Sequence, residues 1–183
     1  MTDSDDNSIK IILLGESGVG KTNLINVFIG REFNEHSEAT STSYNFEGEL
    51  NYKQKPYKYF IWDTCGMEKY RSINKMFIRD SKIIVIVYSI VDKMSFNEVD
   101  FWINFAKENV GKDKYIIALV ANKSDLFEEQ IVMEEDGREI AEKYGIEFFT
   151  TSASTNSKSF QDFVNKLIIN YILIYLKKKK KKK

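Results

Sequence analysis

A glycine-rich run near the start of the chain has the residue types and spacing of a phosphate-binding loop. Its eight residues fit the pattern G-x-x-x-x-G-K-[S/T] and lie between an apolar, β-branched run at 9–14 and a helical pattern at 23–29. A strand, a glycine loop and a helix in this order direct backbone N–H groups at one point, which favours an anion. In this pattern the lysine, Lys21, reaches the β- and γ-phosphates and the Thr22 hydroxyl holds Mg²⁺. The residues predicted to bind a nucleotide here are Gly15, Glu16, Ser17, Gly18, Val19, Gly20, Lys21, Thr22 and Asn23.

Three further polar motifs each follow an apolar run. Asp63-Thr64-Cys65-Gly66 fits D-x-x-G, in which the aspartate holds Mg²⁺ through water and the glycine N–H contacts a γ-phosphate. Asn122-Lys123-Ser124-Asp125 fits N-K-x-D, and a carboxylate there suits the N1–H and exocyclic amine of guanine. Thr151-Ser152-Ala153 follows the last apolar run, where N–H groups can meet the base carbonyl. Because the carboxyl ends of parallel strands share one edge, a guanine-nucleotide site is predicted from Asp63, Gly66, Asn122, Lys123, Asp125, Ser152 and Ala153.

The fold that must position these motifs is predicted to be α/β. Near-continuous apolar runs at 82–88 and 115–120 are typical of parallel strands covered on both faces. Segment 51–56 has the spacing of a hairpin turn, and Gly145 is a helix C-cap. The pattern indicates a doubly wound, mostly parallel, six-stranded sheet with helices on both faces. Strands are expected at 9–14, 44–50, 57–62, 82–88, 115–120 and 146–149, and helices at 23–29, 95–109, 133–144 and 157–176.

Length and composition favour one intracellular domain. The chain has 183 residues and is 43% hydrophobic, which suits a single core. We expect a disordered N-terminus at 1–7, one domain over 8–176 and a polylysine tail at 177–183. The single cysteine excludes an intramolecular disulfide, and the acidic, polar first eight residues do not form a secretory signal. The longest apolar run, 167–176, is too short to span a bilayer, so a cytoplasmic location is expected.

Charge is unevenly distributed along the chain. Seven of its 27 basic residues are Lys177–Lys183, which leaves 20 basic against 27 acidic residues elsewhere. Such a tail is either a solvated lysine run or a contact with an anionic membrane leaflet, which implies a peripheral location on the cytosolic face of membranes. No other basic patch is visible, so nucleic acid is not an expected partner.

Together these motifs resemble the Ras superfamily of small GTPases, and the Rab family most closely, over roughly 8–176. Trp62-Asp63-Thr64-Cys65-Gly66 is similar to the Rab segment W-D-T-A-G, and 69–73 and 77–80 resemble R-[F/Y]-x-S-[I/L] and Y-Y-R-G. The resemblance implies a P-loop small-GTPase domain that binds GTP and GDP with Mg²⁺, hydrolyses GTP and recruits effectors in vesicle trafficking. It also implies exchange-factor and activating-protein partners.

The resemblance assigns further residues. Phe33 is expected to stack edge-on on guanine, and Trp62 and Phe77 to join Phe46 or its neighbour in an effector-facing aromatic cluster. Ser154 lies in the base-binding loop, where the family often has lysine. The expected ligands of Mg²⁺ are Thr22, Thr40 and Asp63, and the residues with a part in hydrolysis are Lys21, Thr40, Gly66 and Met67.

Three departures from the family pattern change the expected activity. Met67 stands where the family has the glutamine that orients the attacking water, and a thioether cannot take that role, so slow hydrolysis is predicted. The alternative is a GTP-binding interaction module with negligible hydrolysis; a small-molecule kinase is disfavoured by the guanine motif. The sequence ends in lysine and not in cysteine, so no prenylation of this terminus is expected unless the sequence is truncated.

The third departure concerns the Mg²⁺-ligating hydroxyl of switch I, which lacks the usual T-I-G. Thr40, Ser41 and Thr42 are the candidates. Counting without gaps from Lys21 and back from Trp62 favours Thr40, whereas an aromatic match at Phe46 favours Ser41.

Overall fold

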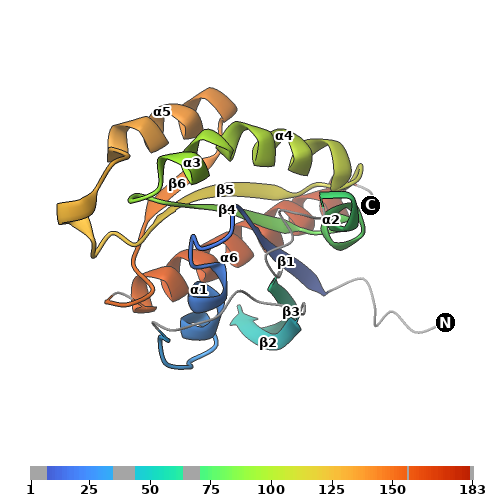
Figure 1. Ribbon diagram of the computed structural model, residues 1–183. Helices are drawn as coiled ribbons and strands as arrows, with labels where there is room; N and C mark the ends of the chain where they lie inside the picture. The colour runs from blue at the N-terminus through green and yellow to red at the C-terminus, as the bar shows by residue number, and fades with distance from the viewer. Residues whose placement is uncertain (1–7, 35–43, 64–70, 156, 182–183) are drawn as a thin grey trace.

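A central six-stranded sheet organises the molecule, with strand order β2-β3-β1-β4-β5-β6 (Figure 1). The computed structural model describes residues 8–34, 44–63, 71–155 and 157–181. Strand β2 is antiparallel to β3, and every other neighbouring pair is parallel. The predicted α/β fold with a mostly parallel sheet is therefore confirmed. The strands are β1 (Ile9–Leu14), β2 (Tyr44–Tyr52), β3 (Lys55–Asp63), β4 (Ile83–Ser89), β5 (Ile116–Asn122) and β6 (Glu147–Thr150).

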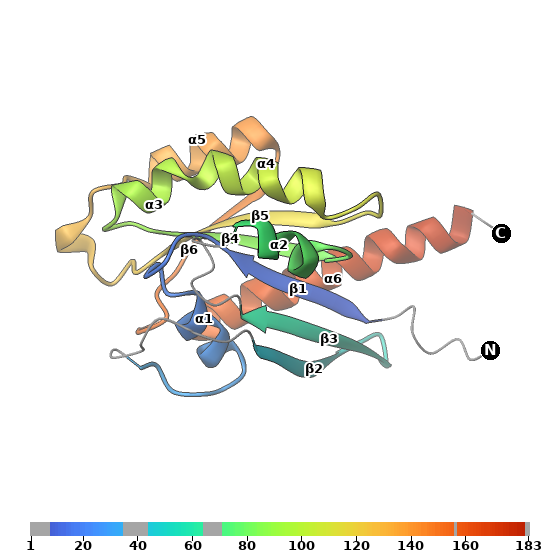
Figure 2. The same ribbon diagram turned by 45° about the vertical axis from the view of Figure 1, so that its right-hand side comes forward.

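Helices cover both faces of this sheet, which explains why its central strands are apolar throughout. Figures 1 and 2 show α1 and α6 on one face and α3, α4 and α5 on the other. In β1, Ile11 and Leu13 pack into the core under α1 and α6, while Ile12 and Leu14 pack toward α4. The helices are α1 (Lys21–Phe28), α2 (Arg71–Ile78), α3 (Lys93–Asn97), α4 (Val99–Asn109), the 3₁₀ helix η2 (Phe127–Glu129), α5 (Glu134–Tyr144) and α6 (Ser157–Lys181).

Several predicted elements differ in detail from the structure. The turn expected over 51–56 is only Lys53-Gln54, whose φ angles of 50° and 61° are those of a two-residue hairpin turn that twists with its strands. The helix expected over 95–109 is two helices, α3 and α4, separated at Glu98. The first begins at Lys93 because the Asp92 carboxylate accepts hydrogen bonds from Met94 N (2.9 Å) and Ser95 N (3.2 Å). Helix α2 and η2 were not predicted from the sequence.

The last helix, α6, continues five residues beyond the predicted boundary at Leu176, as far as Lys181. The backbone of the first five tail lysines is therefore helical. Figure 2 shows that this end of α6 extends away from the sheet, on the side opposite η2. Among the described residues, no helix is long and apolar enough to cross a membrane.

Candidate nucleotide and magnesium site

The loop between β1 and α1 is held closed by its own lysine. Lys21 is buried, and its Nζ donates hydrogen bonds to the carbonyl oxygens of Gly15 and Glu16, both at 2.7 Å. Gly15 has φ 139°, and a Cβ there would lie 2.0 Å from the carbonyl oxygen of Val87 in β4. A glycine is therefore required at this position, because a side chain would collide with backbone that cannot move. The sequence predicted the loop, but not this contact with β4.

The N-terminus of α1 is not capped by a side chain. Gly20 occupies the N-cap position with φ 94°, and the first turn has no acidic residue. N–H groups at a helix N-terminus and an ammonium group beside them form an environment that stabilises anionic oxygen atoms. The arrangement suits a phosphate group held between the loop backbone and Lys21.

Asp63 and Thr22 meet at the edge of this loop. Asp63 is the last residue of β3 and is 2% exposed, and its carboxylate is hydrogen-bonded to the Thr22 side chain. Burial raises the pKa of Asp63, while the Thr22 hydrogen bond and the charge of Lys21 oppose that rise. Among the described residues, no group donates a hydrogen bond to its Oδ1. A buried carboxylate oxygen without a donor, next to a hydroxyl group, is a donor set that fits Mg²⁺.

Asn122, the last residue of β5, connects two loops of the site. Its Nδ2 donates to the carbonyl oxygen of Val19 at 2.8 Å, and its Oδ1 accepts from the backbone N–H of Ala153 at 3.3 Å. The side chain is buried, and a Cβ added at Gly20 would lie 2.5 Å from Nδ2. The structure therefore brings the phosphate loop and the loop after β6 together through one amide, a role that the motif alone did not indicate.

The segment that would contact the base is held in place by hydrogen bonds to its backbone. Lys123 has φ 65°, and Ser124 N donates to the carbonyl oxygen of Thr151 at 3.1 Å. The hydroxyl oxygen of Ser152 accepts from the backbone N–H groups of Ser154 and Thr155, both at 3.1 Å. These contacts place the N-K-x-D motif and the segment 151–155 side by side, as the sequence predicted.

Other predicted site residues are partly located. The Asn23 side chain donates to Asn34 O (2.9 Å) and accepts from Asn34 N (3.2 Å), so α1 holds the segment that contains Phe33. The Phe33 side chain is 39% exposed, so its ring is accessible to a ligand. Thr40, Gly66 and Met67 lie outside the described residues, as do Ser41 and Thr42.

One contact to the phosphate loop comes from a residue that the sequence did not single out. Trp102 of α4 is 2% exposed, and its Nε1 donates to the Glu16 carboxylate at 3.0 Å. The two residues are 86 positions apart. The sequence signal for such a link is a tryptophan at a position that the helical pattern places in the core, because a buried indole N–H usually has an acceptor.

The expected aromatic cluster is only partly present. The rings of Trp62 and Phe77 pack with their centroids 5.7 Å apart. Phe46, however, lies on the opposite face of the sheet, where it packs into the core with α1 and α6 and its ring faces the Arg31 guanidinium at 5.0 Å. The register pairs Trp62 with Asn45, so the neighbouring position holds an exposed polar residue. The expectation that Phe46 joins the cluster was wrong, because side chains alternate between the faces of a strand.

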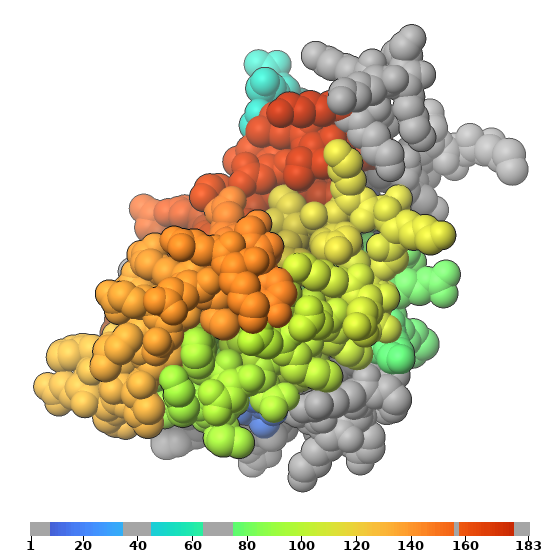
Figure 3. Space-filling view, turned by 90° about the horizontal axis from the view of Figure 1, so that it is seen from above, coloured from blue at the N-terminus to red at the C-terminus, as the bar shows by residue number. Residues whose placement is uncertain are grey.

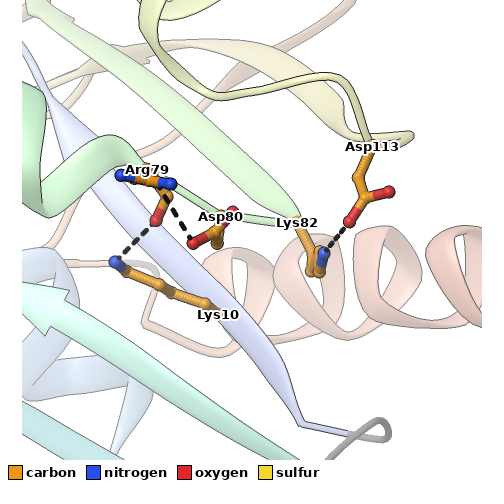
Figure 4. A network of polar contacts seen from close by, with 5 residues as sticks. All are labelled: Lys10, Arg79, Asp80, Lys82 and Asp113. Carbon is orange, nitrogen blue, oxygen red and sulfur yellow. Dashed lines mark hydrogen bonds and ion pairs between the residues drawn. The ribbon is translucent and has the colours of Figure 1, made fainter.

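The C-terminal end of α2 is fastened to the sheet by a network of polar contacts (Figure 4). Lys10 Nζ donates to the Arg79 carbonyl oxygen at 3.0 Å and lies 5.4 Å from the centroid of the Trp62 ring. Burial lowers the pKa of Lys10, and the nearby charge of Asp80 partly opposes this. Asp80, at φ 61°, donates its N–H to the Val110 carbonyl oxygen. The end of α2 is therefore joined to both β1 and the end of α4.

Comparison with known proteins agrees with this arrangement. A model of the Ras family matches residues 10–170. The chain is 37% identical to Ras-related protein Rab-11B of Dictyostelium discoideum, over 96% of this chain and 78% of that protein. It is 36% identical to Ras-related protein Rab-21 of Geodia cydonium, over 87% of this chain and 70% of that protein. It is also 36% identical to Ras-related protein RABA2b of Arabidopsis thaliana, over 88% of this chain and 77% of that protein. The chain therefore belongs to the Ras family of small GTPases and is Rab-like.

Proposed function

We propose that this protein is a guanine-nucleotide switch that binds GTP and GDP with Mg²⁺. The observation that carries the proposal is the meeting of three groups at one edge of the sheet: Lys21 in the phosphate loop, Asp63 beside Thr22, and Asn122 between the phosphate loop and Ala153. Sites for the phosphates, the metal ion and the base at the carboxyl ends of β1, β3 and β5 suit the parts of a nucleotide with bound Mg²⁺.

Each side chain then has a distinct task. Lys21 neutralises charge on the β- and γ-phosphates, and Thr22 and Asp63 hold Mg²⁺, which supplies further neutralisation when bound. Asp125 accepts two hydrogen bonds from guanine, with Lys123 and the N–H groups of 152–154 around the base. Hydrolysis is in-line attack by water.

Base selectivity is the sharpest test of this proposal. Submicromolar binding of GDP and GTP is expected, with ATP at least about 10³-fold weaker, because the Asp125 carboxylate would face adenine N1, which has no hydrogen to donate. Asp125→Asn should shift the preference toward xanthine nucleotides, while Asp113→Asn, a change on an exposed loop, should not. Competition titrations with labelled GDP decide this, and equal competition by ATP and GTP would contradict the base assignment.

Met67 leads us to propose that hydrolysis is slow. Every other part of the hydrolytic site has a candidate residue, but no group at this position can orient the water. Met67→Gln should raise the single-turnover rate about tenfold or more. If the wild type already hydrolyses GTP as fast as Met67→Gln, another side chain orients the water. If neither turns over, the chain is a GTP-binding interaction module.

For switch I, the hairpin register supports Thr40 as the Mg²⁺ ligand. The case for Ser41 depended on an aromatic match at Phe46, and that residue packs on the face of the sheet opposite Trp62. The strands pair residue for residue from Tyr44–Asp63 to Tyr52–Lys55, which favours an ungapped count. Thr40→Ala should lose the preference for GTP over GDP more than Ser41→Ala or Thr42→Ala, with GDP affinity almost unchanged.

The similarity to proteins named Rab supports a role in vesicle trafficking. In that role bound GTP would order Thr40 and residues 63–71 for contact with an effector, and GDP would release them. Exchange factors and activating proteins would set its nucleotide state. The lysines at the end of α6 support a reversible, salt-sensitive contact with an anionic leaflet, and thus a cytosolic, peripheral location. Co-sedimentation with anionic and neutral vesicles, with and without 177–183, tests this; equal binding to both would contradict it.

A further inference from the structure

An exposed apolar patch lies between β5 and α5, beside the base-binding motif. Phe127, Ile131 and Met133 are 68%, 57% and 53% exposed, all within seven residues. The backbone N–H groups of Ile131 and Val132 both donate to the Ile90 carbonyl oxygen, which fixes this segment against the body. Val132 is fully buried, and Ile131 and Met133, on either side of it in an extended segment, remain at the surface.

The residue at the start of α5 is unusual for its position. Met133 is the N-cap, where Ser, Thr, Asp or Asn would accept a hydrogen bond from the free N–H groups of the helix. Here a capping box forms, in which Met133 N donates to the Asp136 carboxylate at 3.2 Å and the methionine side chain, a weak acceptor, faces the backbone N–H of Asp136. Methionine is a weaker cap than those residues and leaves an apolar side chain 53% exposed, which is a feature of contact surfaces.

The same stretch holds the acidic excess of the protein. Residues 125–142 contain eight acidic residues and one arginine, and residues 177–183 are seven lysines. Outside these two stretches the chain is balanced, with 19 acidic and 19 basic residues. We call the exposed part of the first stretch, with Phe127, Ile131 and Met133 among Glu128, Glu129 and Glu135, the acidic-apolar surface.

The two charged regions lie at opposite ends of the molecule. Figure 2 shows η2 at one edge and the C-terminal end of α6 at the other, and Figure 3 shows η2 and the start of α5 as a lobe at the margin of the face formed by α3, α4 and α5. A helix of 25 residues is about 37 Å long at 1.5 Å per residue. Because α6 is helical to Lys181, the lysines at 177–181 do not reach the acidic-apolar surface of their own chain.

We propose that the acidic-apolar surface binds the lysine end of α6 from a second copy of this chain. The charges of the two regions are equal in magnitude and opposite in sign, and one exposed apolar residue, Leu173 at 36%, precedes the lysines on α6. Different patches meet in such a contact, so it is heterologous and joins copies head to tail. An anionic membrane competes for the same lysines and releases the acidic-apolar surface.

Two variants, each lacking one half of the contact, provide the test. One lacks residues 177–183; the other carries Glu128→Lys, Glu129→Lys and Glu135→Lys. In sedimentation velocity at about 50 mM salt, the wild type should show a sedimentation coefficient that rises with protein concentration, and at about 500 mM salt this should disappear. Each variant alone should stay monomeric, whereas an equimolar mixture should give a dimer that does not extend, since only one complementary pair remains.

Two controls separate this contact from general charge effects. The triple change Glu49→Lys, Glu108→Lys and Asp162→Lys makes the same alteration in net charge at exposed positions elsewhere and should still associate. Phe127→Ser with Ile131→Ser should weaken association about tenfold, while Met76→Ser, 72% exposed on α2, should not. All variants should retain bound guanine nucleotide, so a failure here is distinguishable from a failure of the proposed function.

The proposal is overturned if the wild type stays monomeric at low salt, if the chain without 177–183 still associates, or if the equimolar mixture gives no dimer. Binding of the lysines to anionic vesicles without binding to a second copy would equally contradict it.

Discussion

The side-chain amide of Asn122 donates a 2.8 Å hydrogen bond to the carbonyl oxygen of Val19, which lies 103 residues earlier in the chain. Its oxygen accepts from Ala153 N on the other side. One buried amide therefore sets the distance between the phosphate loop and the base-binding loop. A nucleotide can be held at both ends only if that distance is correct, so this contact aligns the two halves of the site.

Asn122→Ala should accordingly lower both stability and nucleotide affinity. It leaves a buried carbonyl and N–H without partners, which costs about 1–3 kcal/mol in the free energy of unfolding. Nucleotide affinity should fall at least about tenfold. Asn109→Ala, which removes a hydrogen bond to Phe105 within α4, is the matched control and should leave affinity unchanged. Urea unfolding and labelled-GDP titration measure the two effects; wild-type affinity in Asn122→Ala would show that the loops align without this amide.

Gly15→Ala and Gly18→Ala should differ sharply although both glycines have positive φ. A Cβ at Gly15 would lie 2.0 Å from backbone of β4, whereas a Cβ at Gly18 would meet nothing within 4 Å. Gly18→Ala bears only the conformational penalty of about 1 kcal/mol, while Gly15→Ala must also displace the loop or the strand. We expect Gly15→Ala to abolish nucleotide binding and Gly18→Ala to reduce it modestly. Equal affinities for the two variants would argue against the rigid contact with β4.

Asp63→Asn should remove a pH dependence of stability in metal-free protein. Burial raises the pKa of Asp63 above its unfolded value of 3.8, so the native state binds the proton more tightly than the unfolded chain. This contribution to stability is full below the unfolded pKa and is lost as pH rises through the folded pKa. In EDTA and without nucleotide, the stability of the wild type relative to Asp63→Asn should therefore fall as pH rises from about 4. A constant difference across pH would contradict the burial effect.

Lys10→Met should loosen the end of α2. The ammonium group donates to the Arg79 carbonyl oxygen, and losing one such bond costs about 1 kcal/mol. Amide hydrogen exchange of Asp80 and Ser81 should become about fivefold faster. Lys82→Met, which removes the ion pair with Asp113 at 3.1 Å, is the control and should leave these amides unchanged. Unaltered exchange in Lys10→Met would mean that the Asp80–Val110 hydrogen bond is enough to hold this end.

Much of the fold could be predicted because its signals are local. The runs that became β1, β4 and β5 are apolar except at Lys10, Ser89 and Asn122, and a near-continuous apolar run is typical of a strand buried on both faces. The phosphate loop and the N-K-x-D motif were found for the same reason: each is a short spacing that a glycine conformation or a base edge imposes. The break at Glu98 was missed because Phe96, Val99 and Trp102 continue a helical pattern across it, and the start at Lys93 because it depends on the N-cap at Asp92.

The rest depended on which residues the sheet brings side by side. Phe46 and Asn45 are adjacent in the sequence, and only the pairing of Asn45 with Trp62 decides which of them shares a face with that tryptophan. The links from Asn122 to Val19 and from Trp102 to Glu16 likewise join segments about a hundred residues apart. The sequence by itself determined the elements and the chemical groups at their ends. The tertiary structure decided which of those groups touch, because strand register and helix packing, and not residue type, set the distances between them.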